Sequence, residues 1–185
     1  MLRFLWQYVT KPRTTGAVAP SSRYLARKMM ASVDFAQARC IVEFGPGTGV
    51  FTKEILRRRR ADTVVIIIER NADFCAVLRQ RFAGEANVHI INGSAEHIGT
   101  HLQAQGFSHA DYIVSGLPFA SLPGEVSAAI LQNARTHLHA NGRFITFQYS
   151  LLRKGLIGSY FPEITITREW RNLPPAYVLS CREKK

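Results

Sequence analysis

The sequence predicts an α/β fold in which a mostly parallel sheet of about seven strands carries helices on both faces and ends in a C-terminal antiparallel hairpin. An apolar strand and a glycine turn, residues 40–49, precede a helix and a second apolar strand, residues 64–68, which ends in Glu69. Strand and helix patterns then alternate as far as residue 149, which is typical of a parallel sheet. Two last strand patterns, 163–170 and 176–181, flank a Pro-Pro turn and predict the hairpin.

Composition sets the class of protein. With 185 residues, 46% of them apolar and 10% aromatic, the chain has the make-up of one globular domain and not of a disordered protein. No run approaches 18 apolar residues and no secretory signal is recognisable, so we expect a cytoplasmic protein without a membrane-spanning helix. The cysteines Cys40, Cys75 and Cys181 lack the spacing of a metal or redox site and predict buried, reduced thiols and no metal centre.

The formal net charge of +11 indicates the kind of partner. Such a surface attracts polyanions, which are either nucleic acid or the anionic face of a bilayer. Charge alone does not choose between them.

The N-terminal segment carries an apolar helical stripe. Residues 2–9 place Leu2, Leu5, Trp6 and Val9 on one helical face, with cations nearby. Such a helix can lie in a membrane interface, which predicts contact with an anionic membrane through residues 1–13. It can equally cap the core of its own domain. The loop over 14–22 either closes over a ligand or only connects, and Ser21 or Ser22 caps a helix that runs to about residue 32.

The first strand leads into the turn Glu43-Phe44-Gly45-Pro46-Gly47-Thr48-Gly49. Its glycines let the backbone turn sharply and approach a ligand, and the N-terminus of the following helix suits an anionic group. Glu69 lies 20 residues past Gly49, where an acid can accept both hydroxyls of a ribose. A dinucleotide site would need a glycine in place of Val50, so we expect a different nucleotide cofactor.

The order E-x-G-x-G-x-G is similar to motif I of class I methyltransferases, a Rossmann-like fold that binds S-adenosylmethionine. The alternative is a glycine-rich turn of another α/β protein. The resemblance implies cofactor contacts at Glu43, Gly45, Gly47, Thr48, Gly49, Glu69, Arg70, Ser94, Ala95 and Ser115. Many family members carry an acid at the position of Ser94, so we expect a weaker or backbone-only contact with adenine there.

The remaining elements follow from periodicity and from helix or strand breakers. We expect helices over about 49–60, 72–82 and 125–138, strands at 88–92, 111–114 and 143–149, and a turn at Asn141-Gly142. The first of these helices ends in the four arginines 57–60, which we interpret as a solvated helix end. Residues 151–161 are basic and apolar and receive no assignment.

The segment after the fourth strand, Ser115-Gly116-Leu117-Pro118-Phe119, faces the ligand crevice of such a sheet. Adenine and cytosine amino-methyltransferases have [Asn/Asp/Ser]-[Pro/Leu]-Pro-[Tyr/Phe] here. The polar residue holds the flat amino group, and the aromatic ring stacks on the base. Gly116 stands in the Asn position, which disfavours a nucleobase acceptor, although Ser115 could substitute. We expect the Phe119 ring to line an apolar slot for the acceptor.

Several segments resemble the bacterial phospholipid N-methyltransferases related to rRNA adenine dimethylases. They are residues 15–22, 43–49, 115–119, 147–150 and 172–176. The resemblance implies a lid over residues 1–32, a single S-adenosylmethionine-binding methyltransferase domain over 33–185, and methylation of the amine of phosphatidylethanolamine towards phosphatidylcholine by a peripheral membrane enzyme.

We assign candidate roles around this acceptor. The expected catalytic residues are Phe119, Tyr149, Ser115 and Gly116. The expected substrate contacts are Tyr24, Ser21, Ser22, Leu117, Pro118 and Phe119. An alkylammonium with a pKa of about 10 must lose a proton before it attacks, and Tyr149 or water could accept that proton. Tyr24 and Tyr149 could also face the methylated ammonium through cation–π contacts, or each could simply be a packing residue.

Two other functions stay open. The first is an rRNA or other nucleic-acid adenine N6-methyltransferase, which the charge and Phe119 favour and Gly116 opposes. The second is a non-catalytic binding module that keeps the cofactor fold, against which the intact glycine turn and Glu69 argue.

Overall fold

The computed structural model describes residues 21–184. The helix predicted over 2–9, the membrane contact predicted through 1–13 and most of the loop predicted over 14–22 lie outside the described residues. Among the helices of the described part, none combines the length and the apolar character needed to cross a membrane.

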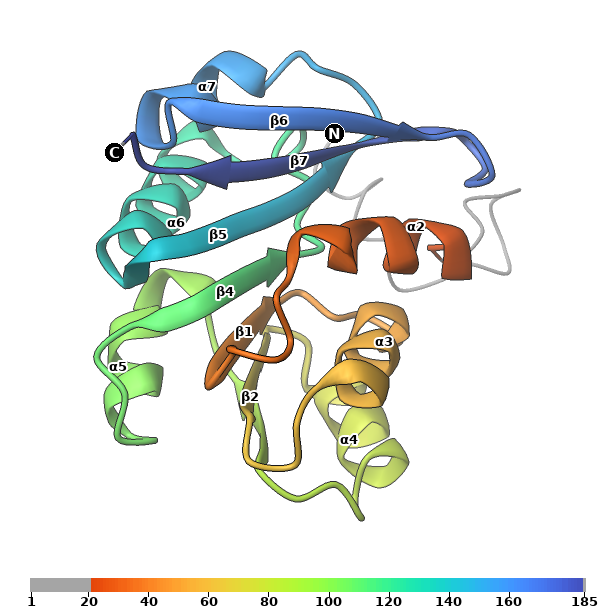
Figure 1. The fold of residues 1–185 in the computed structure, drawn as a ribbon, viewed down its shortest axis with the longest axis vertical. Coiled ribbons are helices and arrows are strands. Elements are labelled where there is room, and N and C mark those ends of the chain that lie inside the picture. Colours follow the sequence, from red (N-terminus) through yellow and green to blue (C-terminus); the bar gives the residue numbers. More distant parts are fainter. Residues whose placement is uncertain (1–20, 185) are drawn as a thin grey trace.

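A seven-stranded sheet with the order β3-β2-β1-β4-β5-β7-β6 runs through the described residues (Figure 1). Its parallel strands are β1 (Cys40–Phe44), β2 (Val64–Glu69), β3 (Val88–Asn92), β4 (Ala110–Ser115) and β5 (Leu138–Gln148). The last two strands, β6 (Glu163–Glu169) and β7 (Ala176–Arg182), form a hairpin, and β7 runs antiparallel to β5. The predicted α/β fold with its C-terminal hairpin is confirmed.

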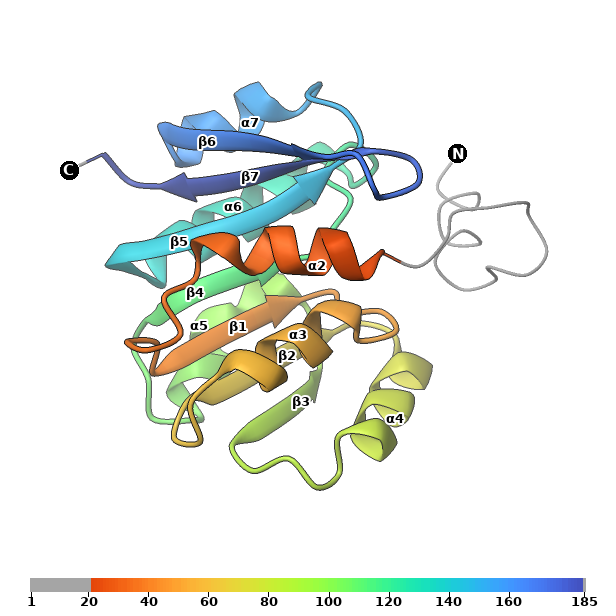
Figure 2. The same cartoon turned by 45° about the vertical axis from the view of Figure 1, so that its right-hand side comes forward.

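Helices cover both faces of this sheet (Figure 2). One layer holds α2 (Arg23–Met29) with the 3-10 turn Met30–Ser32, α3 (Val50–Arg58) and α4 (Ala72–Arg81). The other holds the 3-10 turn Ala95–His97, α5 (Ile98–Gln103), α6 (Gly124–Thr136) and α7 (Lys154–Tyr160). Alternate residues of a strand face opposite sides. In β1, Ile41 therefore packs with the core under α2 and α3, whereas Val42 and Phe44 pack with the core under α5, α6 and α7.

The fifth strand begins earlier than predicted, because Asn141 and Gly142 lie inside β5 and do not form a turn before it. The pairing of β5 with β4 shifts register there, so that Ala110 faces Leu138 while Tyr112 faces Arg143. An ideal Cβ on Gly142 would lie 2.6 Å from the Asp111 carbonyl oxygen. Glycine thus permits a bulge in which the two strands stay paired.

Two short helices, α5 and α7, were not predicted. Both contain glycine, at Gly99 in α5 and at Gly155 and Gly158 in α7, and glycine lowers intrinsic helix propensity. Each helix is held instead by tertiary packing of one apolar face. Leu102 of α5 and Ile157 of α7 are fully buried in the core.

The run of arginines at the end of α3 is only partly a solvated helix end. Arg57 pairs with Glu54 on the same helix. The Arg59 side chain, by contrast, is almost entirely buried and donates to the carbonyl oxygens of Thr63 and Ala86. That part of the prediction is wrong, because Arg59 ties α3 to the loop before β3. The predicted buried thiols are found, since all three cysteines are buried and free of disulfides.

Candidate active site

The glycine turn and the acceptor segment are joined just beyond the strands that carry them. The Gly45 N–H donates to the Ile68 carbonyl oxygen at 3.0 Å, and the Gly116 N–H donates to the Phe44 carbonyl oxygen at 2.8 Å. These bonds extend the pairing of β1 with β2 and β4 by one residue. The loops that follow three parallel strands therefore meet in fixed register at the carboxyl edge of the sheet, where α/β proteins bind ligands.

The glycine turn uses backbone conformations that residues other than glycine adopt only with strain. Gly45 has φ +61° and Gly47 has φ +55°, both in the left-handed region. An ideal Cβ on Gly45 would lie 2.7 Å from the Leu117 Cδ2, so the turn and the acceptor segment pack directly against each other. A Cβ on Gly47 would meet nothing within 4 Å, so no protein atom crowds that side of the turn.

Glu69 reaches the glycine turn from the end of β2. Its Oε2 accepts a hydrogen bond from the Gly47 N–H at 3.3 Å, and its Oε1 accepts one from the Asn71 N–H at 2.8 Å. The Asn92 amide donates to the carbonyl oxygens of both Glu69 and Arg70 and so fixes the end of β2. The carboxylate is thereby held beside the turn, at the position expected for a ribose contact.

Glu43 is fully buried under the same turn. Its Oε2 accepts a hydrogen bond from the Thr52 hydroxyl at 2.6 Å, while its Oε1 is buried and has no hydrogen-bond partner among the described residues. Burial raises the pKa of Glu43 to about 8, because water no longer solvates the charged carboxylate. An unpaired buried oxygen costs free energy until a donor reaches it. Thr52 was not predicted as a site residue. Its hydroxyl on the otherwise apolar face of α3 was the signal that could have identified it.

Ser94 and Ala95, which were expected near adenine, interact mainly with their own turn and with the core. The Ser94 hydroxyl lies 2.7 Å from Glu96 Oε2 and also caps the 3-10 turn Ala95–His97. Ala95 is buried in the core. Ser94 and Ala95 could therefore contact a cofactor only through their backbone atoms. The contact with adenine stays a prediction. Of the other expected cofactor residues, Thr48 and Arg70 are exposed.

The acceptor segment presents little polar side chain. Ser115 is fully buried, and its hydroxyl oxygen accepts a hydrogen bond from the Leu117 N–H at 3.3 Å. An ideal Cβ on Gly116 would lie 2.6 Å from the Gly45 carbonyl oxygen, so the backbone here admits only glycine without a shift. Gln148, absent from the predicted site, donates to the Leu117 carbonyl oxygen at 3.1 Å and positions this segment.

Phe119 lies elsewhere than expected. Its side chain is 0% exposed and packs edge-on against Phe144, with 6.1 Å between ring centres, next to the stacked ring of Phe161. The expectation that this ring lines an open slot is wrong for this structure, because the chain turns after Pro118 and carries the ring into the core beneath α6 and α7. Phe119 therefore anchors the acceptor segment 115–119 to the core.

The structure brings Ser22 and Tyr149 together around Asn172, which was not predicted as a site residue. The Ser22 N–H donates to Asn172 Oδ1 at 2.9 Å, and the Asn172 amide donates to the Pro174 carbonyl oxygen at 2.7 Å. Burial raises the pKa of Tyr149, and a hydrogen bond with Asn172 opposes that rise. Ser22 also caps α2 as predicted, through its hydroxyl and the Leu25 N–H.

Tyr24 faces arginines. The guanidinium groups of Arg23 and Arg171 lie 5.0 and 4.3 Å from the centre of its ring. The hydrogen bond from Arg23 lowers the pKa of Tyr24. A methylated ammonium would have to displace one of these cations, so the expected cation–π contact of Tyr24 stays a prediction without structural support.

The glycine turn and the acceptor segment both lie within a stretch that matches a known protein family. The family model described as "Ribosomal RNA adenine dimethylase" matches residues 21–154, which include the glycine turn and the acceptor segment. The chain belongs to this family. It is accordingly a class I methyltransferase that uses S-adenosylmethionine.

Relatives within and around the dimethylase family differ in how much of the chain they match. The chain is 36% identical to an ornithine lipid N-methyltransferase of Singulisphaera acidiphila, over 98% of this chain and 95% of that protein. It is 32% identical to a ribosomal RNA small subunit methyltransferase A of Methylococcus capsulatus, over 50% of this chain and only 34% of that protein.

Solved structures share the fold of this dimethylase-family chain at low identity. A precorrin-6y methyltransferase of Geobacter metallireducens superposes with a TM-score of 0.70 at 12% identity, over 94% of this chain and 96% of that one. A 16S rRNA methyltransferase of T. thermophilus, solved in complex with AdoMet and guanosine, gives 0.68 at 18% identity, over 93% of this chain and 45% of that one. They confirm the Rossmann-like methyltransferase fold.

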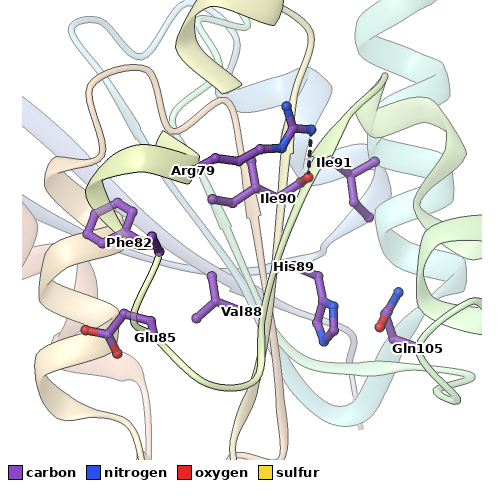
Figure 3. Close-up of a pocket in the computed structure, with 9 residues that line it drawn as sticks. Arg79, Phe82, Glu85, Val88, His89, Ile90, Ile91 and Gln105 are labelled. Atoms are coloured by element: carbon purple, nitrogen blue, oxygen red, sulfur yellow. Dashed lines mark hydrogen bonds between the residues drawn. The ribbon is translucent and has the colours of Figure 1, made fainter. Parts of the chain in front are cut away.

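A separate hollow lies at the far edge of the sheet, outside this site. Figure 3 shows it beside β3, with side chains of α4 and the loop after it on one side and Gln105 on the other. Arg79 donates to the Ile90 carbonyl oxygen there at 3.1 Å and so occupies part of the strand edge. None of the predicted site residues lines this hollow. Within residues 21–184, His, Cys, Asp and Glu side chains form no group of three that could hold a metal ion.

Proposed function

We propose that this methyltransferase transfers methyl groups to the amine of a membrane phospholipid, phosphatidylethanolamine, towards phosphatidylcholine. The observation that carries the proposal is the acceptor segment. Gly116 has no side chain and no room for one, and the Ser115 hydroxyl is buried against its own loop. A planar nucleobase amino group would find no side-chain amide or carboxylate there, whereas an alkylamine needs none. The lipid N-methyltransferase relative, matched over nearly its whole length, supports this acceptor class.

The residues at the carboxyl edge fit the cofactor. Glu69 would accept the ribose hydroxyls, and the uncrowded side of Gly47 would lie against the ligand. The unpaired Glu43 Oε1 would gain a donor, and Ser94, Ala95 and Ser115 would contribute through the backbone. When bound, S-adenosylmethionine supplies an electrophilic methyl group on a sulfonium, and the protein's part is to align an acceptor lone pair with it.

The acceptor must arrive at this edge as a neutral amine, because an alkylammonium has no free lone pair. Leu117 and Pro118 offer it an apolar surface that disfavours the charged form. Burial raises the pKa of Tyr149, so its phenol keeps its proton and can hold the amine as a hydrogen-bond partner. We assign the removal of the proton to water.

The N-terminal segment completes the proposal from its sequence. Residues 1–13 would bind the anionic bilayer face through the stripe of Leu2, Leu5, Trp6 and Val9 and the flanking cations. Of the lid expected over residues 1–32, α2 packs into the core with the domain expected over 33–185, so the part that precedes α2 would close over the two sites.

The deciding experiment offers all acceptors at once. Purified protein is incubated with labelled S-adenosylmethionine, mixed vesicles of phosphatidylethanolamine and phosphatidylglycerol, vesicles that contain ornithine lipid, and total RNA. Mass spectrometry of each pool should find methylated phosphatidylethanolamine. Label in ornithine lipid alone would keep the lipid-amine class and overturn the choice of phosphatidylethanolamine. Dimethyladenosine in RNA with unmodified lipid would overturn the class.

A further inference from the structure

Two loops at the carboxyl edge of the sheet expose large apolar side chains to water. In the hairpin between β6 and β7, Trp170 is 66% exposed and Leu173 is 76% exposed. In the loop after β5, Leu152 is 86% exposed and Leu151 is also exposed. We call these four residues, Leu151, Leu152, Trp170 and Leu173, the edge patch. Side chains of this size gain free energy when another apolar phase removes them from water.

The strand register places the two loops at the same end of the sheet. Gln148, the last residue of β5, pairs with Tyr177, and Glu169, the last residue of β6, pairs with Ala176. Both loops therefore leave the sheet where the parallel strands end, at the edge that carries the glycine turn. Figures 1 and 2 show the hairpin and the loop after β5 at this end of the sheet, with the hairpin near the start of α2.

Trp170 and the loop after β5 also lie towards the same face of the sheet. Arg168 pairs with Tyr177, which packs against the core under α6 and α7. Trp170 lies two residues after Arg168, in the turn just beyond the end of β6. The Arg168 guanidinium lies 3.7 Å from the centre of the Trp170 ring. The indole is thus held towards the side of the sheet on which Leu151 and Leu152 lead into α7.

The two loops that carry the edge patch are rich in positive charge. The segments 149–154 and 168–175 contain Arg153, Lys154, Arg168 and Arg171 and a single acid, Glu169. That acid is engaged by Arg171 at 3.1 Å and by Lys28 at 3.9 Å. Exposed leucines and an indole in loops that also carry cations match the two layers of an anionic bilayer surface, which are the acidic headgroups and the acyl chains beneath them.

We propose that the edge patch, with Arg153, Lys154 and Arg168, docks on the surface of an anionic phospholipid bilayer. The patch is separate from residues 1–13 and would set the carboxyl edge of the sheet against the membrane. RNA is the less suitable occupant, because unpaired bases stack on aromatic rings and gain little from Leu151, Leu152 and Leu173. The biological purpose of this docking rests on the proposed lipid-amine function. The physical case for it rests on the exposed side chains of the edge patch and on the nearby cations.

The test uses the protein's two tryptophans, Trp6 and Trp170. In the full-length Trp6→Phe variant, fluorescence reports on Trp170 alone. Titration with phosphatidylglycerol–phosphatidylethanolamine vesicles should shift its emission to the blue, and lipids brominated on their acyl chains should quench it. The double variant Trp170→Ser/Leu173→Ser should lower the vesicle partition coefficient at least tenfold without lowering the melting temperature. Val77→Ser, which alters an exposed apolar residue on α4, is the matched control and should bind like wild type.

Three results would overturn the inference. The first is an unchanged Trp170 spectrum on vesicles that do sediment the protein, since residues 1–13 would then account for the binding. The second is a spectral shift with RNA and none with vesicles. The third is a lowered melting temperature of the double variant, which would mean that the patch packs against the chain itself. Insertion of Trp170 without any lipid methylation would support the docking surface and count against the proposed function. Lipid methylation with Trp170 still in water would support the proposed function and count against the docking surface.

Discussion

Asn172, in the turn between β6 and β7, accepts a hydrogen bond at 2.9 Å from the backbone N–H of Ser22, which lies 150 positions earlier in the chain. The bond joins the start of α2 to the hairpin. Tyr149, the residue that follows β5, forms a hydrogen bond with the same Asn172 side chain. One buried side chain therefore connects three segments, two of which carry the residues Ser22 and Tyr149 that were expected at the acceptor.

The first prediction removes that connection. Asn172→Ala leaves the Ser22 N–H without its acceptor, so the free energy of unfolding should fall by about 1–3 kcal/mol. Hydrogen exchange should accelerate in α2 next to Ser22 and stay unchanged in α6. Asn133→Ala is the control, because the Asn133 amide bonds only within α6, to the Ala129 carbonyl oxygen. Equal exchange in α2 of both variants would show that the bond does not hold the helix.

The second prediction concerns the cofactor. Glu69→Ala removes the carboxylate beside the glycine turn, and S-adenosylmethionine affinity should weaken by about 1–3 kcal/mol, the cost of hydroxyls left without acceptors. Isothermal titration calorimetry measures the effect directly. Glu125→Ala, on the exposed first turn of α6, should bind like wild type. Wild-type affinity of the Glu69 variant would remove Glu69 from the site.

The third prediction follows from the raised pKa of Glu43, which is about 8 in the folded protein because of burial. Between the ordinary value of 4.5 and about 8, the unfolded chain loses this proton while the folded chain keeps it. The folded state then binds more protons, so Glu43 lowers stability as pH rises through this window. Glu43→Gln cannot ionise and should remove that fall, on the order of a few kcal/mol between pH 5 and pH 8.

Urea unfolding without cofactor at several pH values measures this slope. Glu125→Gln should keep the pH dependence of the wild type, so the difference between the two variants isolates Glu43. Parallel stability curves for Glu43→Gln and wild type would mean that the Glu43 carboxyl is not the group responsible.

The fourth prediction concerns the closeness of the two loops. Gly116→Ala places a Cβ 2.6 Å from the Gly45 carbonyl oxygen, so the glycine turn must shift. We expect a loss of about 1–3 kcal/mol in stability, as for other overpacked sites, together with weaker cofactor binding and slower methyl transfer. Gly155→Ala in α7 meets nothing within 4 Å and should be neutral or slightly stabilising. Thermal melting and single-turnover assays compare the pair.

The fifth prediction concerns the acceptor amine. The rate of methyl transfer to phosphatidylethanolamine should rise with pH, because the neutral fraction of the amine rises towards its pKa of about 10. Since burial raises the pKa of Tyr149, the phenol stays protonated over this range. Tyr149→Phe should therefore lower turnover but keep the pH dependence, and Tyr160→Phe in α7 should change neither. A flat pH profile for Tyr149→Phe would identify the phenol as the base.

The fold and the cofactor turn were predictable because their signals are local. The strand before Gly45, the glycine spacing and the acid at the end of β2 lie within 30 residues of one another. Hydrophobic alternation likewise located β3, β6 and β7 to within a residue or two. The bulge at Gly142 was not predictable, because an Asn-Gly pair has the same local signal whether it ends a strand or bends one.

The acceptor side depends on contacts that no local pattern encodes. The motif around Phe119 predicts an aromatic ring at the site, but only the path of the chain after Pro118 shows that the ring enters the core with Phe144. The same holds for Asn172 and Ser22, which tertiary folding brings together. The residue types at this edge follow from the sequence, whereas the direction in which each side chain points depends on the tertiary fold.

The contact between Gly45 and Leu117 has a thermodynamic consequence. Gly45 belongs to the turn proposed to bind the cofactor and Leu117 to the segment proposed to bind the acceptor, and the leucine side chain leaves no room for a Cβ between them. A ligand that moves either loop must therefore work against the other, so the two binding equilibria share a coupling free energy. Such coupling is reciprocal: whatever factor S-adenosylmethionine contributes to the affinity for the methyl acceptor, the acceptor contributes to the affinity for S-adenosylmethionine.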